Sequence, residues 1–221
     1  AQNNVASLKD YLKLLRGKND ETAALYKDLL INVTSFFRDT DTFRYLKTTF
    51  LPRLIKMHVS EKPIRIWVPA CSSGEEAYSI AMILMELQEK QAKKIQVQIF
   101  ATDLSKSAIR DARVGEYSKQ DLEIVSAARI KAFFIRTGNT YRISKEVREI
   151  CVFAPHNLLK DPPFYHIDFI SCCNLLIYFD TSAQKKALST MHFALNKTGF
   201  LMLGKSESTN ASPSLFKQMN D

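Results

Sequence analysis

Short apolar segments alternate with helical patterns between residues 64 and 204, and this alternation constrains the fold more than any other feature of the sequence. Five segments have the length and character of buried strands: IRIWVPA (64–70), VQIFATD (97–103), CVFAPHN (151–157), IDFISCC (167–173) and GFLMLG (199–204). Helical patterns at 75–91, 105–113 and 181–195 separate several of them. Strands that are apolar on both faces are typical of a parallel sheet covered on both sides. The alternation therefore predicts an α/β fold with an open, doubly wound sheet.

The first third of the chain has a helical pattern instead. Leu8, Leu12 and Leu15 share one face at the spacing of an amphipathic helix. A second helix, capped by Asn19 or Asp20, is expected to carry Leu25, Leu29 and Leu30. A third is expected from about Asp41 toward His58, with Pro52 either kinking or restarting it.

The predicted organisation is a partial helical domain with its linker at 1–58 and a sheet domain at 59–221. Residues 117–150 do not fit the strand–helix rhythm, since a polar helical stretch precedes NTYRISKEVREI, and they predict a small inserted β-subdomain. The chain of 221 residues suits one large domain, or one domain with a small appendage. Its start lacks an initiator Met and a secretory signal, so we expect a piece of a longer chain.

The four cysteines predict free thiols in a reducing cytosol, so we expect a cytoplasmic protein. Cys71, Cys151, Cys172 and Cys173 form no CxxC pair, and no histidine lies at metal-ligand spacing from them. We expect free, mostly buried thiols and no metal. No run of about 18 apolar residues predicts a membrane span.

A formal net charge of +8 favours an acidic partner. One stretch holds six basic residues against Glu146, a local net charge of +5: Arg129, Lys131, Arg136, Arg142, Lys145 and Arg148. A solvated basic face without a partner is the alternative. Nucleic acid is not favoured, because no zinc-finger, RNP or KH signature is present.

The corner PACSSGEE follows the first predicted strand, where open α/β sheets bind ligands. Small residues at 70 and 72–74 allow backbone to approach a ligand closely. The corner is neither GxGxxG nor a P-loop, and a pyrophosphate would meet the like charges of Glu75 and Glu76. A carboxylate at this place suits an ammonium or sulfonium group instead.

Asp103 follows the next predicted strand, where an acid commonly accepts hydrogen bonds from ribose hydroxyls. An acid for a cation beside an acid for a ribose fits S-adenosylmethionine. The same residues allow a structural interpretation. Ser72 with Glu75, and Ser73 with Glu76, match the capping box Ser-x-x-Glu, and Asp103 is placed to cap a helix near Ser105.

Five motifs occur in order along the chain: NVTSFFRD, ACSSGEEAYSIAM, ATDLS, FAPHNLL and NLLIYFD. In order and spacing they resemble the CheR-type chemotaxis-receptor methyltransferases, from about Leu25 to the closing LMLGKSES at Glu207. The resemblance implies a Rossmann-like fold and a cytoplasmic enzyme. It implies methyl transfer from S-adenosylmethionine, with S-adenosylhomocysteine as product, to glutamates on the cytoplasmic helices of chemoreceptors.

The matching motifs also imply the site residues. Asn32, Thr34 and Arg38 would line the cofactor and acceptor site, and Glu76 would hold the methionine end. Asp103 would bind the ribose, Asn157 and Leu158 the adenine side, Cys173 would lie beside the cofactor, and Asn174 and Tyr178 would close the pocket. The basic stretch corresponds to the family's inserted β-subdomain, which in some members docks a receptor tail.

Two departures from the family pattern stand out. The family typically has Cys-Arg-Asn where this chain has Cys172-Cys173-Asn174, and a thiol supplies neither the charge nor the forked donors of arginine. In addition, few residues precede NVTSFFR, whereas the family usually has a longer helical domain there. The chain thus resembles the methyltransferase half of hybrids that also carry a methylesterase.

Methyl transfer to a carboxylate requires no general base, because a glutamate with a pKa of about 4.3 is already ionised at neutral pH. Arg38 and Tyr178 are the predicted catalytic donors that align it. Each has a structural alternative, since Arg38 is placed to pair with Asp39 or Asp41, and Tyr178 to be a core aromatic. His156 and His166 are expected to be structural.

The function predicted from the sequence is therefore protein-glutamate methylation. One alternative, motivated by Cys173, is a module that binds S-adenosylmethionine or S-adenosylhomocysteine with little or no turnover. Another is methylation of RNA or a small molecule, although no aromatic stacking platform is evident.

Overall fold

The computed structural model describes residues 7–17, 34–58, 62–89 and 95–219, and it divides into two compact units, residues 1–33 and 34–221. In the first unit, helix α1 (Leu8–Gly17) confirms the predicted amphipathic helix. Ser7 caps it, because its hydroxyl accepts from the backbone N–H of Asp10 at 3.2 Å. The predicted second helix, with Leu25, Leu29 and Leu30, lies outside the described residues, as does Asn32.

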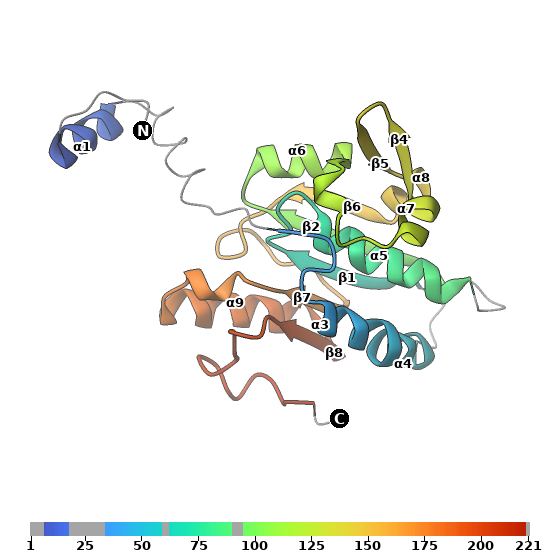
Figure 1. The fold of residues 1–221 in the computed structure, drawn as a ribbon. Helices are drawn as coiled ribbons and strands as arrows, with labels where there is room; N and C mark the ends of the chain where they lie inside the picture. The colour runs from blue at the N-terminus through green and yellow to red at the C-terminus, as the bar shows by residue number, and fades with distance from the viewer. Residues whose placement is uncertain (1–6, 18–33, 59–61, 90–94, 220–221) are drawn as a thin grey trace. The chain divides into compact units, whose positions relative to one another are not determined.

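The second unit is built on a five-stranded parallel sheet with the order β6-β2-β1-β7-β8 (Figure 1). The strands are β1 (Ile64–Pro69), β2 (Val97–Asp103), β6 (Cys151–Pro155), β7 (Ile167–Cys172) and β8 (Leu195–Leu203). The predicted doubly wound sheet is confirmed. The last strand begins earlier than predicted, since Leu195 already pairs with Ile167.

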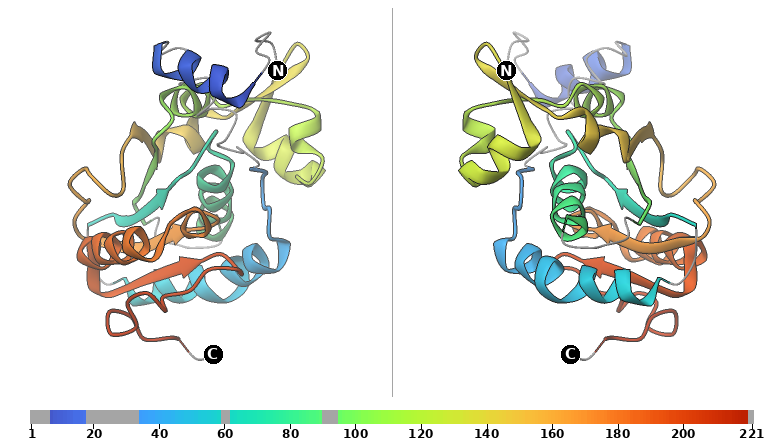
Figure 2. Two further views of the ribbon diagram at one scale, coloured as in Figure 1. Left: turned by 90° about the vertical axis from the view of Figure 1, so that its left-hand side faces the viewer. Right: turned by 90° about the vertical axis from the view of Figure 1, so that its right-hand side faces the viewer.

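Apolar side chains cover both faces of this sheet. On one face Ile64, Ile66 and Val68 of β1 belong to a core with helix α5 (Glu75–Gln88). On the other, Trp67 packs in a second core with helix α9 (Thr181–Ala194), and the two helices lie on opposite sides in Figure 2. Burial of both faces explains why the strands are apolar throughout rather than alternating.

A nearly continuous helix precedes the sheet. It consists of α3 (Thr40–Tyr45), a π-helical turn (Leu46–Phe50) and α4 (Leu51–Met57). The π turn ends at Phe50, and Pro52 lies two residues further on, where its missing N–H removes one hydrogen bond of the continuous helix. The helix continues through this turn, so Pro52 is accommodated by a change in helical pitch.

This helix packs with the sheet unit. Phe43, Leu46 and Phe50 are buried in the same core as β1, and the Phe50 ring lies 4.7 Å from that of Phe169. The compact unit accordingly begins at Thr34, well before the predicted boundary near residue 58. The boundary differs because the periodicity of a helix does not show which core its apolar face packs against.

The inserted β-subdomain is confirmed and gathers at one end of the unit (Figure 1). Its antiparallel sheet has the order β3-β5-β4 and comprises β3 (Glu116–Ser118), β4 (Phe134–Thr137) and β5 (Thr140–Ile143). Short helices accompany it: a 3₁₀ turn (Gln120–Leu122), α7 (Ala127–Phe133) and α8 (Lys145–Glu149). Gly138 makes the β4–β5 turn with a φ of 60°, a conformation that glycine adopts without strain.

Helix α6 (Lys106–Val114) follows β2 and completes the strand–helix alternation. Among the residues that the structure describes, none of the helices has the length and apolar character needed to cross a bilayer.

Candidate functional site

The carboxyl ends of the parallel strands meet at one edge of the sheet. From β1 the chain moves outward to β2 and then β6 on one side, and later to β7 and β8 on the other. The direction of winding therefore reverses between β1 and β7, which is where open α/β sheets bind ligands. The loops after β1, β2, β6 and β7 carry most of the residues that the sequence motifs selected.

The loop after β1 is held in an unusual backbone conformation. Ala70, Ser72 and Gly74 have φ values of 56°, 49° and 100°, in the left-handed region. A Cβ on Gly74 would lie 3.1 Å from both Ala112 and Phe153, and at this φ any side chain would be strained. Left-handed non-glycine residues cost about 1–3 kcal/mol each and cluster at functional sites. The backbone of this loop is therefore held in a locally unfavourable conformation.

The capping-box interpretation of this loop is wrong. The residue before helix α5 is Gly74, and no side chain caps the helix. The Ser73 hydroxyl donates to Glu75 at 3.0 Å, and the Ser72 backbone N–H donates to Asp103 at 2.9 Å. Asp103 is not a helix cap either, because Ser105 caps α6 by accepting from the Ala108 N–H at 3.2 Å.

Asp103 has a fixed carboxylate at the end of β2. Oδ2 accepts from the backbone N–H of Ser72, and Oδ1 accepts from that of Ser105 at 2.8 Å. Each carboxylate oxygen has two acceptor positions, so each retains one for a ligand hydroxyl. This arrangement suits a vicinal diol such as a ribose.

Glu76 lies in the first turn of α5 and reaches toward β7. The Ser171 hydroxyl donates to its Oε1 at 2.5 Å. Burial raises the pKa of Glu76 to about 7, although hydrogen bonds from Ser171 and Cys173 and the charge of Arg38 oppose this rise. Its side chain is only partly exposed. The carboxyl group is therefore poised to ionise when a cation arrives.

Asn157 and Leu158 follow β6 and lie beside Asp103. The two strands pair at Asp103 and Pro155, and the His156 N–H donates to the Asp103 carbonyl at 2.9 Å. Asn157 Oδ1 accepts from the Leu159 N–H at 3.0 Å, and Leu158 is 8% exposed. The structure thus brings the loop of Asn157 and Leu158 beside the end of β2, with the Leu158 side chain buried in the core that contains α9.

Among the described residues, the two histidines predicted to be structural make packing and polar contacts. The His156 ring packs edge-on against Trp67, and its Nε2 lies 3.0 Å from the Pro162 carbonyl oxygen. His166 contacts the Asn196 side chain at 3.4 Å.

Cys173, Asn174 and Tyr178 lie in a turn after β7, which ends in the 3₁₀ helix Leu176–Tyr178. Asn174 has a φ of 60°. The Tyr178 side chain is 61% exposed, so the alternative that it is a core aromatic is wrong. Burial raises the pKa of the Cys173 thiol, which is therefore neutral. All four cysteines are free and three are buried, as expected.

Two buried phenylalanines anchor the segment that carries Arg38. Phe36 and Phe37 are at most 4% exposed, and the Phe37 N–H donates to the Ser79 hydroxyl of α5 at 3.0 Å. Arg38 itself is exposed, and its charge acts on Glu76. Its sequence neighbours have other cationic partners, since Lys205 lies 2.7 Å from Asp39 and Arg44 lies 3.1 Å from Asp41.

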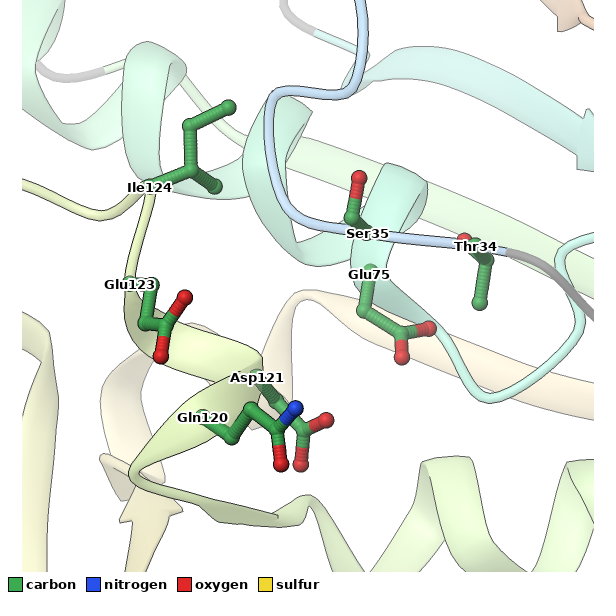
Figure 3. Close-up of a pocket in the computed structure, with 7 residues that line it drawn as sticks. All are labelled: Thr34, Ser35, Glu75, Gln120, Asp121, Glu123 and Ile124. Atoms are coloured by element: carbon green, nitrogen blue, oxygen red, sulfur yellow. The ribbon is translucent and has the colours of Figure 1, made fainter.

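Thr34 faces an acidic cavity of about 270 Å³ beside the start of α5 (Figure 3). The lining residues are Thr34, Ser35, Glu75, Gln120, Asp121, Glu123 and Ile124. Burial raises the pKa of Glu75, and the Asp121 charge adds to this effect. The cavity thus lies between the Thr34–Arg38 segment and the inserted subdomain.

Three residues of the site were not predicted from the sequence. Ser171 bonds Glu76, Glu207 accepts hydrogen bonds from the turn after β7, and Gln184 donates to the same turn. Ser171 is a hydroxyl inside a buried strand, a pattern that signals a polar partner. Glu207 lies in the closing GKSE motif, to which no role was assigned. No local signal marks Gln184.

These features define a class: a Rossmann-like methyltransferase that uses S-adenosylmethionine. The fold agrees with that of the citrinin polyketide synthase CMeT domain, with a TM-score of 0.51 and 18% identity over 87% of this chain and 41% of that one. The family model "CheR methyltransferase, SAM binding domain" matches residues 32–221. The chain therefore belongs to the CheR methyltransferase family, and its cofactor is S-adenosylmethionine.

Two relatives illustrate this membership. A chemotaxis protein methyltransferase from Vibrio parahaemolyticus is 35% identical over 221 residues, which are 97% of this chain and 79% of the relative. An uncharacterised 104.1 kDa protein from Rhodobacter capsulatus is 39% identical over 203 residues. The matched region covers 92% of this chain but only 21% of that protein.

Proposed function

We propose that this protein transfers the methyl group of S-adenosylmethionine to glutamate side chains on the cytoplasmic helices of chemoreceptors. The observation that carries the proposal is a pair of acids at one edge of the sheet, Asp103 at the end of β2 and Glu76 at the start of the helix after β1, with the Arg38 charge acting on Glu76. The relative named as a chemotaxis protein methyltransferase supports the choice of pathway.

In this proposal Asp103 binds the ribose, Glu76 the cofactor's amino group, and Asn157 with Leu158 the adenine. Thr34, Cys173 and Asn174 complete the cofactor site. Asn32, which lies outside the described residues, stays a prediction, as does association with further domains of a hybrid chain. The protein is proposed to act in the cytoplasm.

The reaction is an in-line displacement. A lone pair of the acceptor carboxylate forms the new C–O bond, while the S–CH₃ bond breaks and its electrons return to sulfur, leaving a neutral thioether. No proton moves, so no base is needed. The protein contributes alignment and exclusion of water, which supply about 7–11 kcal/mol in well-oriented systems. Arg38 and the Tyr178 phenol are the proposed donors that align the carboxylate, and a neutral phenol leaves the nucleophile more reactive than a second ion pair.

Methyl incorporation into a receptor fragment tests this proposal. With cofactor carrying a labelled methyl group, we expect base-labile label to accumulate on glutamates and to vanish when those glutamates are replaced by glutamine. Label that stays at background on every receptor fragment would contradict the proposal. Label that appears on RNA or a small molecule instead would support the other acceptor classes.

A second candidate function is favoured by one observation. Where the family pattern has arginine, this chain has Cys173, whose neutral thiol lies beside Glu76. Residue 173 therefore supplies no positive charge to neutralise this acid. Such a site binds the cofactor without aligning an acceptor well. The alternative is therefore a signalling module that binds S-adenosylmethionine or its product with little turnover.

The missing arginine predicts a pH-dependent affinity. Because burial raises the pKa of Glu76 to about 7, the group is mostly protonated at pH 6 and mostly ionised at pH 8. The ligand's ammonium group binds the ionised form, so affinity for S-adenosylhomocysteine should rise about tenfold between pH 6 and pH 8. Calorimetry across this range measures it.

Cys173→Arg provides the matched comparison. A guanidinium beside Glu76 lowers the pKa of that carboxyl, so the variant's affinity should be nearly constant over the same range. Glu76→Gln should also remove the dependence, at a weaker affinity. A wild-type affinity that does not change with pH would show that Glu76 does not bind the amino group. Turnover that appears only in Cys173→Arg would favour the binding module.

A further inference from the structure

Glu207 accepts hydrogen bonds from four backbone N–H groups. Three belong to consecutive residues of the turn after β7, with distances of 2.8 Å to Asn174, 2.8 Å to Leu175 and 2.6 Å to Leu176. The fourth comes from Gly204 at 2.8 Å. Consecutive N–H groups that converge on one anion form a nest, and a carboxylate in a nest is bound strongly.

Gln184 of helix α9 holds the other side of the same turn. Its amide nitrogen donates to the carbonyl oxygens of Leu176 and Phe179, both at 3.1 Å. The donors at the start of the turn and the acceptors at its end are thus both satisfied by side chains. Between them lies Tyr178, whose backbone is restrained while its side chain is 61% exposed.

The segment that carries Glu207 is itself adapted to this contact. A Cβ on Gly204 would lie 2.6 Å from Glu207 Oε2 and 3.3 Å from the Asn174 nitrogen, so a side chain there would displace the carboxylate. Lys205, next in sequence, lies 2.7 Å from Asp39, which follows Arg38. One short turn after β8 therefore contacts the segments of both proposed catalytic donors.

We propose that Glu207 and Gln184 are positioning residues that fix the backbone of the Asn174–Tyr178 turn and so aim the Tyr178 hydroxyl at the acceptor carboxylate. This inference rests on the proposed function, because it assigns Tyr178 a role in methyl transfer. It follows from geometry: an exposed side chain keeps a defined direction only when its backbone is held, and a donor displaced by about 1 Å costs about a hundredfold in rate.

Glu207→Gln tests the proposal. An amide has one acceptor oxygen in place of two and turns a donor toward the nest, so several of the four bonds are lost. We expect kcat to fall about 30-fold and KM for the cofactor to rise by clearly less, since Asn174 lies in the turn but Asp103 and Asn157 lie on other loops. Gly204→Ala should reproduce this loss through the close contact with Glu207.

A double-mutant cycle distinguishes positioning from general stability. If Tyr178→Phe lowers kcat about 100-fold, the double variant with Glu207→Gln should lose about 100-fold, not the product of the two losses. Asp168→Asn is the control, because Asp168 accepts from the Arg65 N–H at 2.8 Å at the opposite edge of the sheet. It should lower the melting temperature without lowering kcat.

Hydrogen exchange at the amides of residues 174–176 measures the contact with Glu207 in the absence of any methyl-acceptor substrate. In Glu207→Gln this exchange should be at least about tenfold faster, and in Asp168→Asn unchanged. Unchanged exchange in Glu207→Gln, or losses that multiply in the cycle, would overturn the positioning role. A wild-type protein that binds S-adenosylhomocysteine but methylates no receptor fragment would overturn the proposed function, and Tyr178 positioning with it, even if the exchange result holds.

Discussion

Replacing Arg38 by alanine is expected to lower kcat/KM for methyl transfer by about two to three orders of magnitude. In the proposed mechanism the guanidinium holds the acceptor carboxylate in line with the S–CH₃ bond, and its charge also favours ionised Glu76. The change should leave the fold intact, because the anchors of the segment are the buried Phe36 and Phe37 rather than exposed Arg38. Steady-state kinetics with a receptor fragment measure the loss.

Two comparisons sharpen this expectation. Arg44→Ala removes an exposed arginine of the next helix, whose partner is Asp41, and should change kcat/KM less than about twofold. Arg38→Lys keeps the charge but loses the planar fork, so it should recover only part of the activity. An Arg38→Ala variant as active as Arg44→Ala would remove Arg38 from the mechanism.

The sheet was predictable because its strands carry a strong and local signal. A strand buried on both faces reads as a short apolar run, and IRIWVPA and IDFISCC are such runs at the centre of the sheet. The strand–helix alternation then allowed few topologies. The proposed ligand edge followed from this fold, because Asp103 ends β2 and Glu76 lies in the first turn of the helix after β1, both placed by the strand pattern.

The conformation of the loop after β1 was not predictable. Its sequence fits a capping box, yet Ala70 and Ser72 adopt left-handed conformations that local propensity disfavours. They are held there by partners far along the chain: the Cys71 N–H donates to the Thr102 carbonyl oxygen, and that of Ser72 donates to Asp103. Tertiary contacts therefore overrode the local pattern.

The residues that hold the turn of Tyr178 could not be predicted from the sequence, for a related reason. Glu207 lies 31 to 33 residues beyond the three N–H groups of the turn that it binds, and Gln184 is an ordinary polar residue of helix α9. A motif comparison selects residues that touch the ligand. Residues that hold the backbone of those residues become visible only when the fold brings them together.

Asp103→Ala is expected to weaken binding of S-adenosylhomocysteine by at least about 100-fold, since hydrogen bonds to a charged acceptor contribute about 1.5–3 kcal/mol each. Asp103 is also the acceptor for the N–H groups of Ser72 and Ser105, so the variant loses the carboxylate and the order of two loops together. Calorimetry measures the affinity. Asp168→Asn, at the opposite edge, should bind the product as the wild type does.

A ligand that lacks one ribose hydroxyl separates these two contributions. The wild-type protein should bind 2′-deoxy-S-adenosylhomocysteine about tenfold more weakly than the normal product, because one acceptor position of Asp103 is then left without a donor. Asp103→Ala should bind both ligands equally, whatever the disorder of its loops, because it has no carboxylate for the hydroxyl to meet. If the variant still discriminates between them, another residue reads the ribose. In that case the two acids at the strand ends do not form the cofactor site, and the assignment of Glu76 to the amino group loses its main support.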